Sequence, residues 1–109
     1  MLNKDLIIAK KFKQDLKREL GEEVISIVFY GSRARGVAKN DSDMDILVLM
    51  KERPSQGSII SKKINDLVYK NVDKENIYIS AIPYAVDDFN QQKKYSPVLY
   101  WADKDGIKL

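Results

Sequence analysis

Apolar residues recur near the spacing of a helix over the first twenty positions, at Leu6, Phe12, Leu16 and Leu20. Lysines take another face of the same segment, at Lys10, Lys13 and Lys17. This separation predicts an amphipathic helix over residues 3–20. Gly21 is expected to end it.

Short runs of β-branched and other apolar residues follow. Residues 24–29 are too few for a typical helix and stop before Gly31, so a buried strand is predicted. Residues 43–50 predict a second buried strand, which begins with acidic residues and pairs with the first. Residues 77–82, where apolar and polar positions alternate, predict a third strand that ends before Pro83.

The remaining segments have helical spacing or turn signals. Apolar positions between Ile59 and Val68 predict a second long helix, and residues 86–92 and 97–103 predict two short ones. Residues 106–109 are expected to close the fold as a short edge strand. This order predicts a domain that contains both helices and strands, of class α/β or, more narrowly, α+β. Its mixed sheet of three to four strands is expected to pack against helices. At 109 residues, the chain is expected to form a single domain over residues 1–109.

Composition limits the available chemistry. The chain contains no Cys and no His, which excludes a thiol nucleophile, an imidazole base and a Cys/His zinc site. Carboxylates, hydroxyls, amines and metals bound through oxygen remain, and Mg²⁺ is compatible with such ligands. The charged N-terminus and the lack of an apolar run of bilayer length predict a cytoplasmic protein with no membrane partner.

One motif stands out against this background. Gly31 and Ser32 follow the first predicted strand, and Asp43 and Asp45 open the second. Gly31 lets the backbone approach a phosphate, and Ser32 offers a hydroxyl and a backbone N–H if a helical turn begins there. Asp43 and Asp45 should project from one face of a strand, about 7 Å apart. Two such carboxylates can share a divalent ion, so the combination indicates metal-dependent chemistry on a nucleoside triphosphate.

Two arginines lie inside the motif. Arg33 and Arg35 are two residues apart, so they cannot both face the same way in a regular element. We expect one to contact phosphate and the other to pair with a surface carboxylate. The sequence does not decide which of the two arginines contacts phosphate.

The motif resembles that of minimal members of the nucleotidyltransferase superfamily related to DNA polymerase β. These proteins have Gly-Ser-x-Ala-Arg-Gly followed by Ser-Asp-x-Asp, matched here by Gly31, Ser32, Ala34, Arg35, Gly36, Ser42, Asp43 and Asp45. The resemblance implies transfer of a nucleoside monophosphate to an acceptor hydroxyl, with ATP as the default donor. It also implies that Gly31 and Ser32 hold the terminal phosphates and that Asp43 and Asp45 ligate Mg²⁺ or Mn²⁺.

The sequence departs from the family in one respect. The family usually supplies a third carboxylate from a later strand, but the third predicted strand presents Tyr78 and Ser80 on one face and only apolar residues on the other. Asp73 and Glu75 precede that strand, and alternation places them with the apolar residues. Losing general-base help of about 10² to 10⁴ in rate would leave a slow enzyme or a nucleotide-binding module.

The resemblance also implies a partner. Minimal members act as the antitoxin beside a small helical HEPN-type protein and can adenylylate it. Tyr95, Tyr100 and Trp101 could anchor such an interface, or they could cover the sheet as core residues. A degenerate nucleotide-binding module that holds a partner is the alternative function.

The basic N-terminal segment leaves a third alternative. The formal net charge is +3 and the pI about 9.0, but much of the excess is in the first helix. A solvated helix face explains it at least as well as a nucleic-acid patch. Nucleic-acid binding would weaken steeply with salt and survive the loss of Asp43 and Asp45.

Overall fold

The protein is described from a computed structural model, which covers residues 4–37, 43–72 and 77–109. The elements are α1 (Lys4–Leu20), η1 (Gly21–Glu23), β1 (Val24–Tyr30), α2 (Gly31–Ala34), β2 (Met44–Met50), α3 (Ile59–Lys70), β3 (Ile79–Ala85), α4 (Val86–Gln92), α5 (Pro97–Asp105) and β4 (Ile107–Lys108). Both long helices, both short late helices and the closing strand occur where the sequence predicts them. The first predicted residue of α1, Asn3, lies outside the described residues.

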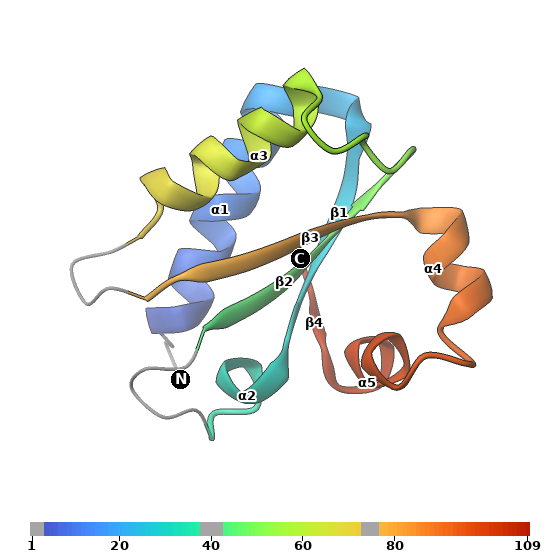
Figure 1. Cartoon of the computed structure of the whole chain (residues 1–109). Helices are drawn as coiled ribbons and strands as arrows, with labels where there is room; N and C mark the ends of the chain where they lie inside the picture. Colours follow the sequence, from blue (N-terminus) through green and yellow to red (C-terminus); the bar gives the residue numbers. More distant parts are fainter. Residues whose placement is uncertain (1–3, 38–42, 73–76) are drawn as a thin grey trace.

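The strands form one mixed sheet with the order β3-β2-β1-β4 (Figure 1). β1 pairs antiparallel with β2 and with β4, whereas β2 and β3 run parallel. The predicted neighbour relation between the first two strands is therefore confirmed. The register places Tyr30, the last residue of β1, opposite Asp45 near the start of β2. The sheet thus brings the two halves of the motif together.

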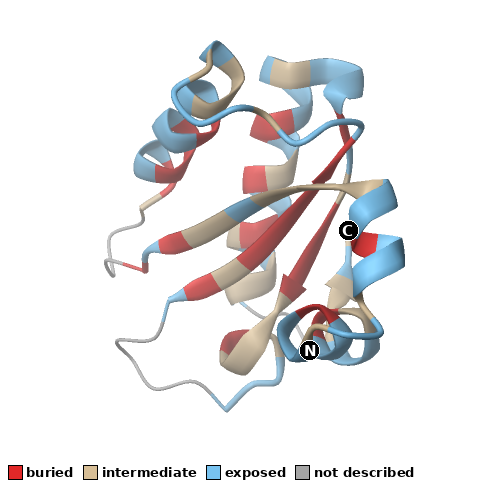
Figure 2. Ribbon diagram, turned by 45° about the vertical axis from the view of Figure 1, so that its right-hand side comes forward, coloured by how far each residue is buried: buried red, intermediate tan, exposed pale blue. Residues whose placement is uncertain are grey.

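Helices cover the sheet on two sides (Figures 1 and 2). α1 and α3 lie side by side on one face, where Phe12, Phe29 and Ile46 belong to the larger buried cluster. α4 and α5 pack on the other face, where Val28 and Leu47 belong to a smaller cluster. The alternation of side chains along a strand divides β1 and β2 between the two clusters. Most residues of these two central strands are buried, which explains why the strands appear as nearly continuous apolar runs.

The third strand is displaced from its predicted position. It spans Ile79–Ala85 rather than residues 77–82, and Pro83 lies inside it, opposite Val48 of β2. Proline has no N–H to donate, so it is confined to edge strands or strand ends. β3 is an edge strand, and Pro83 is tolerated there. Reading Pro83 as a terminator was therefore wrong.

The late aromatic residues are not core residues. The relative exposures of Tyr95, Tyr100 and Trp101 are 82%, 41% and 56%, whereas Leu99 and Ala102 supply the buried side of α5. Of the two alternatives that the sequence left open, the one in which these aromatics cover the sheet as core residues is thus wrong. α5 begins at Pro97, and the Ser96 hydroxyl accepts a hydrogen bond from the Leu99 N–H, an N-cap arrangement.

A buried polar network joins α1 to the end of α3. The Asp15 carboxylate is 4% exposed and accepts hydrogen bonds from Lys11 at 3.2 Å, Arg18 at 2.7 Å and the Asn71 amide at 3.1 Å. Burial raises the pKa of Asp15, but these hydrogen bonds outweigh burial and the pKa is lowered overall. Lys11 and Arg18, two of the N-terminal basic residues, thus have structural partners.

We expect Asp15→Ala to lower the free energy of unfolding by about 1.5–3 kcal/mol at neutral pH, the range for hydrogen bonds to a charged group. Because the folded-state pKa is lowered, this stabilisation is present above the ordinary carboxyl pKa and is lost as the pH falls through the folded value. Denaturant unfolding across an acid series would measure both effects. Asp66→Ala, at an exposed position on α3, is the control and should change stability by less than about 0.5 kcal/mol. An equal loss in both variants would contradict the assignment.

Within the described ranges, no helix is both long enough and apolar enough to cross a membrane.

Candidate functional site

The site begins where β1 ends. Gly31 has a positive φ of +84°, a conformation that residues with a side chain rarely adopt. A Cβ on Gly31 would collide with Oδ2 of Asp45. Glycine therefore allows the chain to turn out of β1 while its backbone packs directly against the Asp45 carboxylate.

A single helical turn, α2, follows at once. It spans Gly31–Ala34, and the Arg35 N–H donates to the Gly31 carbonyl at 3.1 Å. The sequence predicts that Ser32 offers its backbone N–H if a helical turn begins there. A helical turn does begin at this point, with Gly31 as its first residue. The first N–H groups of a helical turn have no carbonyl partner within it. Ser32 is half-buried there, beside the glycine that faces Asp45.

The two motif carboxylates differ in environment. Asp43 is exposed and directly precedes β2, whereas Asp45 is half-buried within it. Burial raises the pKa of Asp45, and the nearby charge of Asp43 raises it further. A bound cation would offset both effects, because it favours the ionised form. The donor set therefore fits a hard divalent metal such as Mg²⁺, which binds one or two carboxylates together with substrate phosphates.

The arginines of the motif have separate surroundings. Arg33 is buried, with 8% exposure, and its guanidinium pairs with the Asp5 carboxylate of α1 at 3.2 Å. Arg35 is exposed and lines a cavity together with Gly31. The structure thus pairs Arg33 with a carboxylate, although this carboxylate belongs to the first turn of α1 and is largely shielded from solvent rather than on the open surface. Arg35, not Arg33, is therefore the arginine that lines a cavity beside Gly31.

β3 supplies the neighbour of Asp45 on its other side. The parallel register sets Ser80 beside Asp45, while Ile77 and Ile79 are buried in the larger cluster, as alternation predicts. In the part of the chain that the structure describes, no three acidic residues gather into a possible metal site. Asp73 and Glu75, the other carboxylates considered in the sequence, lie outside the described residues.

The structure adds a feature that sequence reasoning missed. α5 packs against β1, so Trp101 and Asp105 line a cavity with Tyr30, Gly31 and Arg35. Burial raises the pKa of the Tyr30 phenol, and the charge of Asp45 raises it further. No local pattern joins α5 to residues so far away in the sequence. The only signal was the cluster of aromatic residues in the last quarter of the chain.

Comparison with known proteins shows the family of the chain. The nucleotidyltransferase domain family matches residues 9–104. Two proteins of Methanocaldococcus jannaschii, both named "putative protein adenylyltransferase", are 38% identical over 75 residues and 35% identical over 77 residues. These alignments cover 69% and 71% of this chain and 51% and 76% of the relatives. The chain thus spans about half the length of the first relative.

Two solved structures share the fold. A chain from a toxin–antitoxin structure with AMP-PNP aligns with a TM-score of 0.57 at 16% identity, covering 96% of this chain and 71% of that one. A structure from Sulfolobus solfataricus, described as a "putative nucleotidyltransferase", aligns with a TM-score of 0.51 at 18% identity, covering 94% and 77%. The fold and the family match define the class of protein. The chain belongs to the nucleotidyltransferase domain family.

Proposed function

We propose that this protein transfers a nucleoside monophosphate from ATP to an acceptor hydroxyl, with Mg²⁺ or Mn²⁺ as cofactor. One observation carries the proposal: the backbone of Gly31 packs against the Asp45 carboxylate, and Asp43 lies close enough to raise the pKa of Asp45. A phosphate-binding turn and a metal-binding carboxylate pair are thereby adjacent. Family membership supports the same reaction class.

Each motif residue then has a role. Gly31 and Ser32 bind the terminal phosphates, and Arg35 adds a cation to them. Asp43 and Asp45 hold the metal, which would neutralise charge on the triphosphate and the reacting oxygens. The acceptor oxygen forms a bond to the α-phosphorus, the bond from that phosphorus to the β-phosphate oxygen breaks, and pyrophosphate leaves. The acceptor proton passes to solvent. Because the acceptor oxygen attacks phosphorus directly, no covalent enzyme intermediate is required.

We further propose that the acceptor is a hydroxyl on a protein partner, such as a HEPN-type toxin for which this chain is the antitoxin. The relatives' names mention protein adenylyltransferase, and one fold neighbour comes from a toxin–antitoxin structure. The exposed aromatic residues at Tyr95 and Tyr100 are compatible with a protein interface.

A second candidate is a nucleotide-binding module with weakened catalysis that acts by binding its partner. The observation that favours it is Ser80, which takes the place beside Asp45 where a further carboxylate could bind the metal. A hydroxyl is a poorer ligand and a poorer base than a carboxylate. This candidate keeps Mg-ATP binding but releases little or no pyrophosphate.

Transfer can be tested with ATP labelled in the α-phosphate and a HEPN-type protein as acceptor. The proposal expects metal-dependent release of pyrophosphate and an AMP adduct on the acceptor, located by mass spectrometry. Metal-dependent ATP binding without pyrophosphate release would favour the second candidate. Absence of ATP binding with either metal would contradict both.

Substitutions of Arg33 and Arg35 are expected to affect different measurements. Arg35→Ala is expected to weaken Mg-ATP binding about 10- to 100-fold, because a hydrogen bond to a charged group is worth about 1.5–3 kcal/mol. Arg33→Ala should instead lower the free energy of unfolding, since it leaves the Asp5 carboxylate without the Arg33 guanidinium. Calorimetric titration and denaturant unfolding of both variants measure the two effects. Arg33→Ala weakening ATP binding more than Arg35→Ala would contradict these roles.

A further inference from the structure

A cavity of about 250 Å³ lies between the end of β1, α2 and α5. Its walls are lined by Tyr30, Gly31, Arg35, Pro97, Val98, Trp101 and Asp105. α2 and α5 lie near one another at the same end of the molecule (Figure 1). The cavity is thus built from two segments far apart in the sequence, and Gly31 belongs both to it and to the candidate phosphate site.

The lining of this cavity combines apolar walls with few polar groups. The aromatic rings come from Tyr30 and Trp101, and Pro97 and Val98 add aliphatic surface. Arg35 and Asp105 contribute one cation and one carboxylate. Flat aromatic surface with a small number of oriented polar groups is typical of sites for planar heterocycles. Phosphate alone would not require the aromatic walls.

Trp101 is held as a platform on α5. Its indole packs edge-to-face against Tyr100, with ring centroids 5.1 Å apart, and 56% of the residue is still exposed. An exposed indole offers a large flat surface on which another ring can stack. Every nucleobase presents a face that can stack on such a ring.

The position and size of the cavity limit the ligand. A molecule that fills the cavity and continues past Gly31 into the proposed phosphate site would combine a planar apolar part with an anionic part. The cavity is smaller than the roughly 300–1,000 Å³ of sites that enclose whole small molecules, so it fits a base rather than a complete nucleotide. A nucleoside triphosphate meets both conditions, with its base in the cavity and its phosphates at Gly31.

We propose that this cavity binds the purine base of the nucleotide, with the base stacked on Trp101 and its exocyclic amino group donating to the Asp105 carboxylate. This inference rests on the proposed function, because it takes the phosphates to lie at Gly31 and Ser32. It assigns the donor's base to residues of α5, outside the motif.

Intrinsic fluorescence tests the stacking directly, because Trp101 is the single tryptophan of the chain. Mg-ATP is expected to quench this fluorescence on binding, since the purine covers the indole. Mg-tripolyphosphate, which has no base, should bind without comparable quenching. Calorimetry on the same samples reports binding of both ligands independently of the fluorescence.

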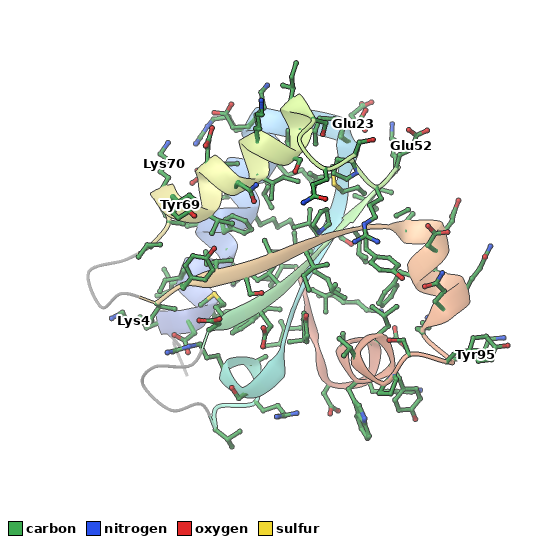
Figure 3. All side chains as sticks on the ribbon, viewed as in Figure 1. Lys4, Glu23, Glu52, Tyr69, Lys70 and Tyr95 are labelled. Atoms are coloured by element: carbon green, nitrogen blue, oxygen red, sulfur yellow. The ribbon has the colours of Figure 1, made fainter. Side chains whose placement is uncertain are left out.

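Variants separate the base from the phosphates. Trp101→Ala is expected to weaken Mg-ATP binding about 5- to 150-fold, the equivalent of one base stacked on an aromatic ring, and to leave tripolyphosphate binding unchanged. Trp101→Phe should restore most of the ATP affinity. Tyr69→Ala is the matched control and should bind Mg-ATP like the parent, because Tyr69 is an exposed aromatic residue on α3 (Figure 3), which packs on the face of the sheet opposite to α5. Asp105→Asn should reduce the preference for ATP over ITP, whose base lacks the amino group.

The possible failures can be told apart. Mg-ATP binding with unchanged fluorescence and no loss in Trp101→Ala would overturn the base site while the proposed function stands. An equal loss of ATP and tripolyphosphate affinity in Trp101→Ala would show that Trp101 supports the fold rather than the base, and would also overturn it. Absence of binding by both ligands would overturn the base site and the proposed function together.

Discussion

The Asp43→Asn/Asp45→Asn double variant is expected to lose metal-dependent nucleotide transfer by about 10³-fold or more. Both carboxylates would be replaced by amides of nearly the same shape, so the metal would lose its charged ligands while the start of β2 is kept. Metal stabilisation of transition-state charge is worth several kcal/mol, and each 1.36 kcal/mol is a factor of ten in rate. Initial rates of pyrophosphate release, measured over a range of Mg²⁺ concentrations, test this result.

The loss should not come from unfolding. The pKa of Asp45 is raised by burial and by Asp43, so the ionised carboxylate disfavours the folded state. Its contribution to stability is present below the ordinary carboxyl pKa and is lost as the pH rises through the folded value. Asp45→Asn alone should therefore raise the free energy of unfolding at neutral pH without metal. That gain should disappear in acid, where the parent carboxyl is protonated in both states.

A matched pair controls for the change in net charge. Asp87 and Asp88 are exposed in the first turn of α4, which follows the far end of β3. Asp87→Asn/Asp88→Asn also removes two negative charges, and this variant should keep a transfer rate within about twofold of the parent. If this pair lost activity as strongly as the motif pair, overall charge rather than metal ligation would explain the effect.

Gly31→Ala is expected to lower both the stability of the fold and the affinity for nucleotide. The left-handed conformation costs a residue with a side chain about 1–3 kcal/mol, and the added methyl group would also displace the Asp45 carboxylate that it meets. We expect a loss of stability together with at least a tenfold loss of Mg-ATP affinity, because the phosphate turn and the carboxylate move apart. Denaturant unfolding and calorimetric titration measure the two consequences separately.

Gly57→Ala isolates the clash from the strain. Gly57 has nearly the same φ, +81°, but an added Cβ there meets nothing within 4 Å. This variant should lose stability through strain alone and bind Mg-ATP like the parent. The difference between the two alanine variants therefore measures the contact with Asp45. Equal ATP affinity in both would contradict the placement of the phosphate site at Gly31.

Local patterns were sufficient for most elements of the fold. α4 spans the predicted residues 86–92, and α5 begins at Pro97 as predicted, where a proline suits the first position of a helix. β3 was misplaced because Pro83 reads as a terminator unless the strand is known to lie at the sheet edge. Edge position is a property of the whole sheet, and residues 77–85 alone do not encode it.

The candidate site was predictable only in part. The spacing of Gly31 and Asp45 within the motif was visible in the sequence, and pairing of β1 with β2 brings them together. The different surroundings of Arg33 and Arg35 were not visible, because they depend on where α1 places Asp5. Trp101 was visible only as one of several late aromatic residues. Its position beside Gly31 is a result of tertiary packing.

Several basic residues of the N-terminal helix have partners within the fold. Lys11 and Arg18 bind Asp15, and the Lys17 ammonium donates to the Val24 carbonyl. These contacts support the interpretation of a solvated helix face with partners inside the fold. Nucleic-acid binding through this helix stays a separate hypothesis, with salt dependence as its distinguishing property.

The central claim is that Asp43 and Asp45 form a metal-dependent nucleotide site with Gly31. Calorimetric titration of the protein with ATP, with and without Mg²⁺, tests it most directly when the Asp43→Asn/Asp45→Asn variant is titrated in parallel. Our account predicts binding that requires metal in the parent protein and is abolished in the variant. Equal Mg-ATP binding by parent and variant, or no binding by the parent at millimolar ATP, would contradict it.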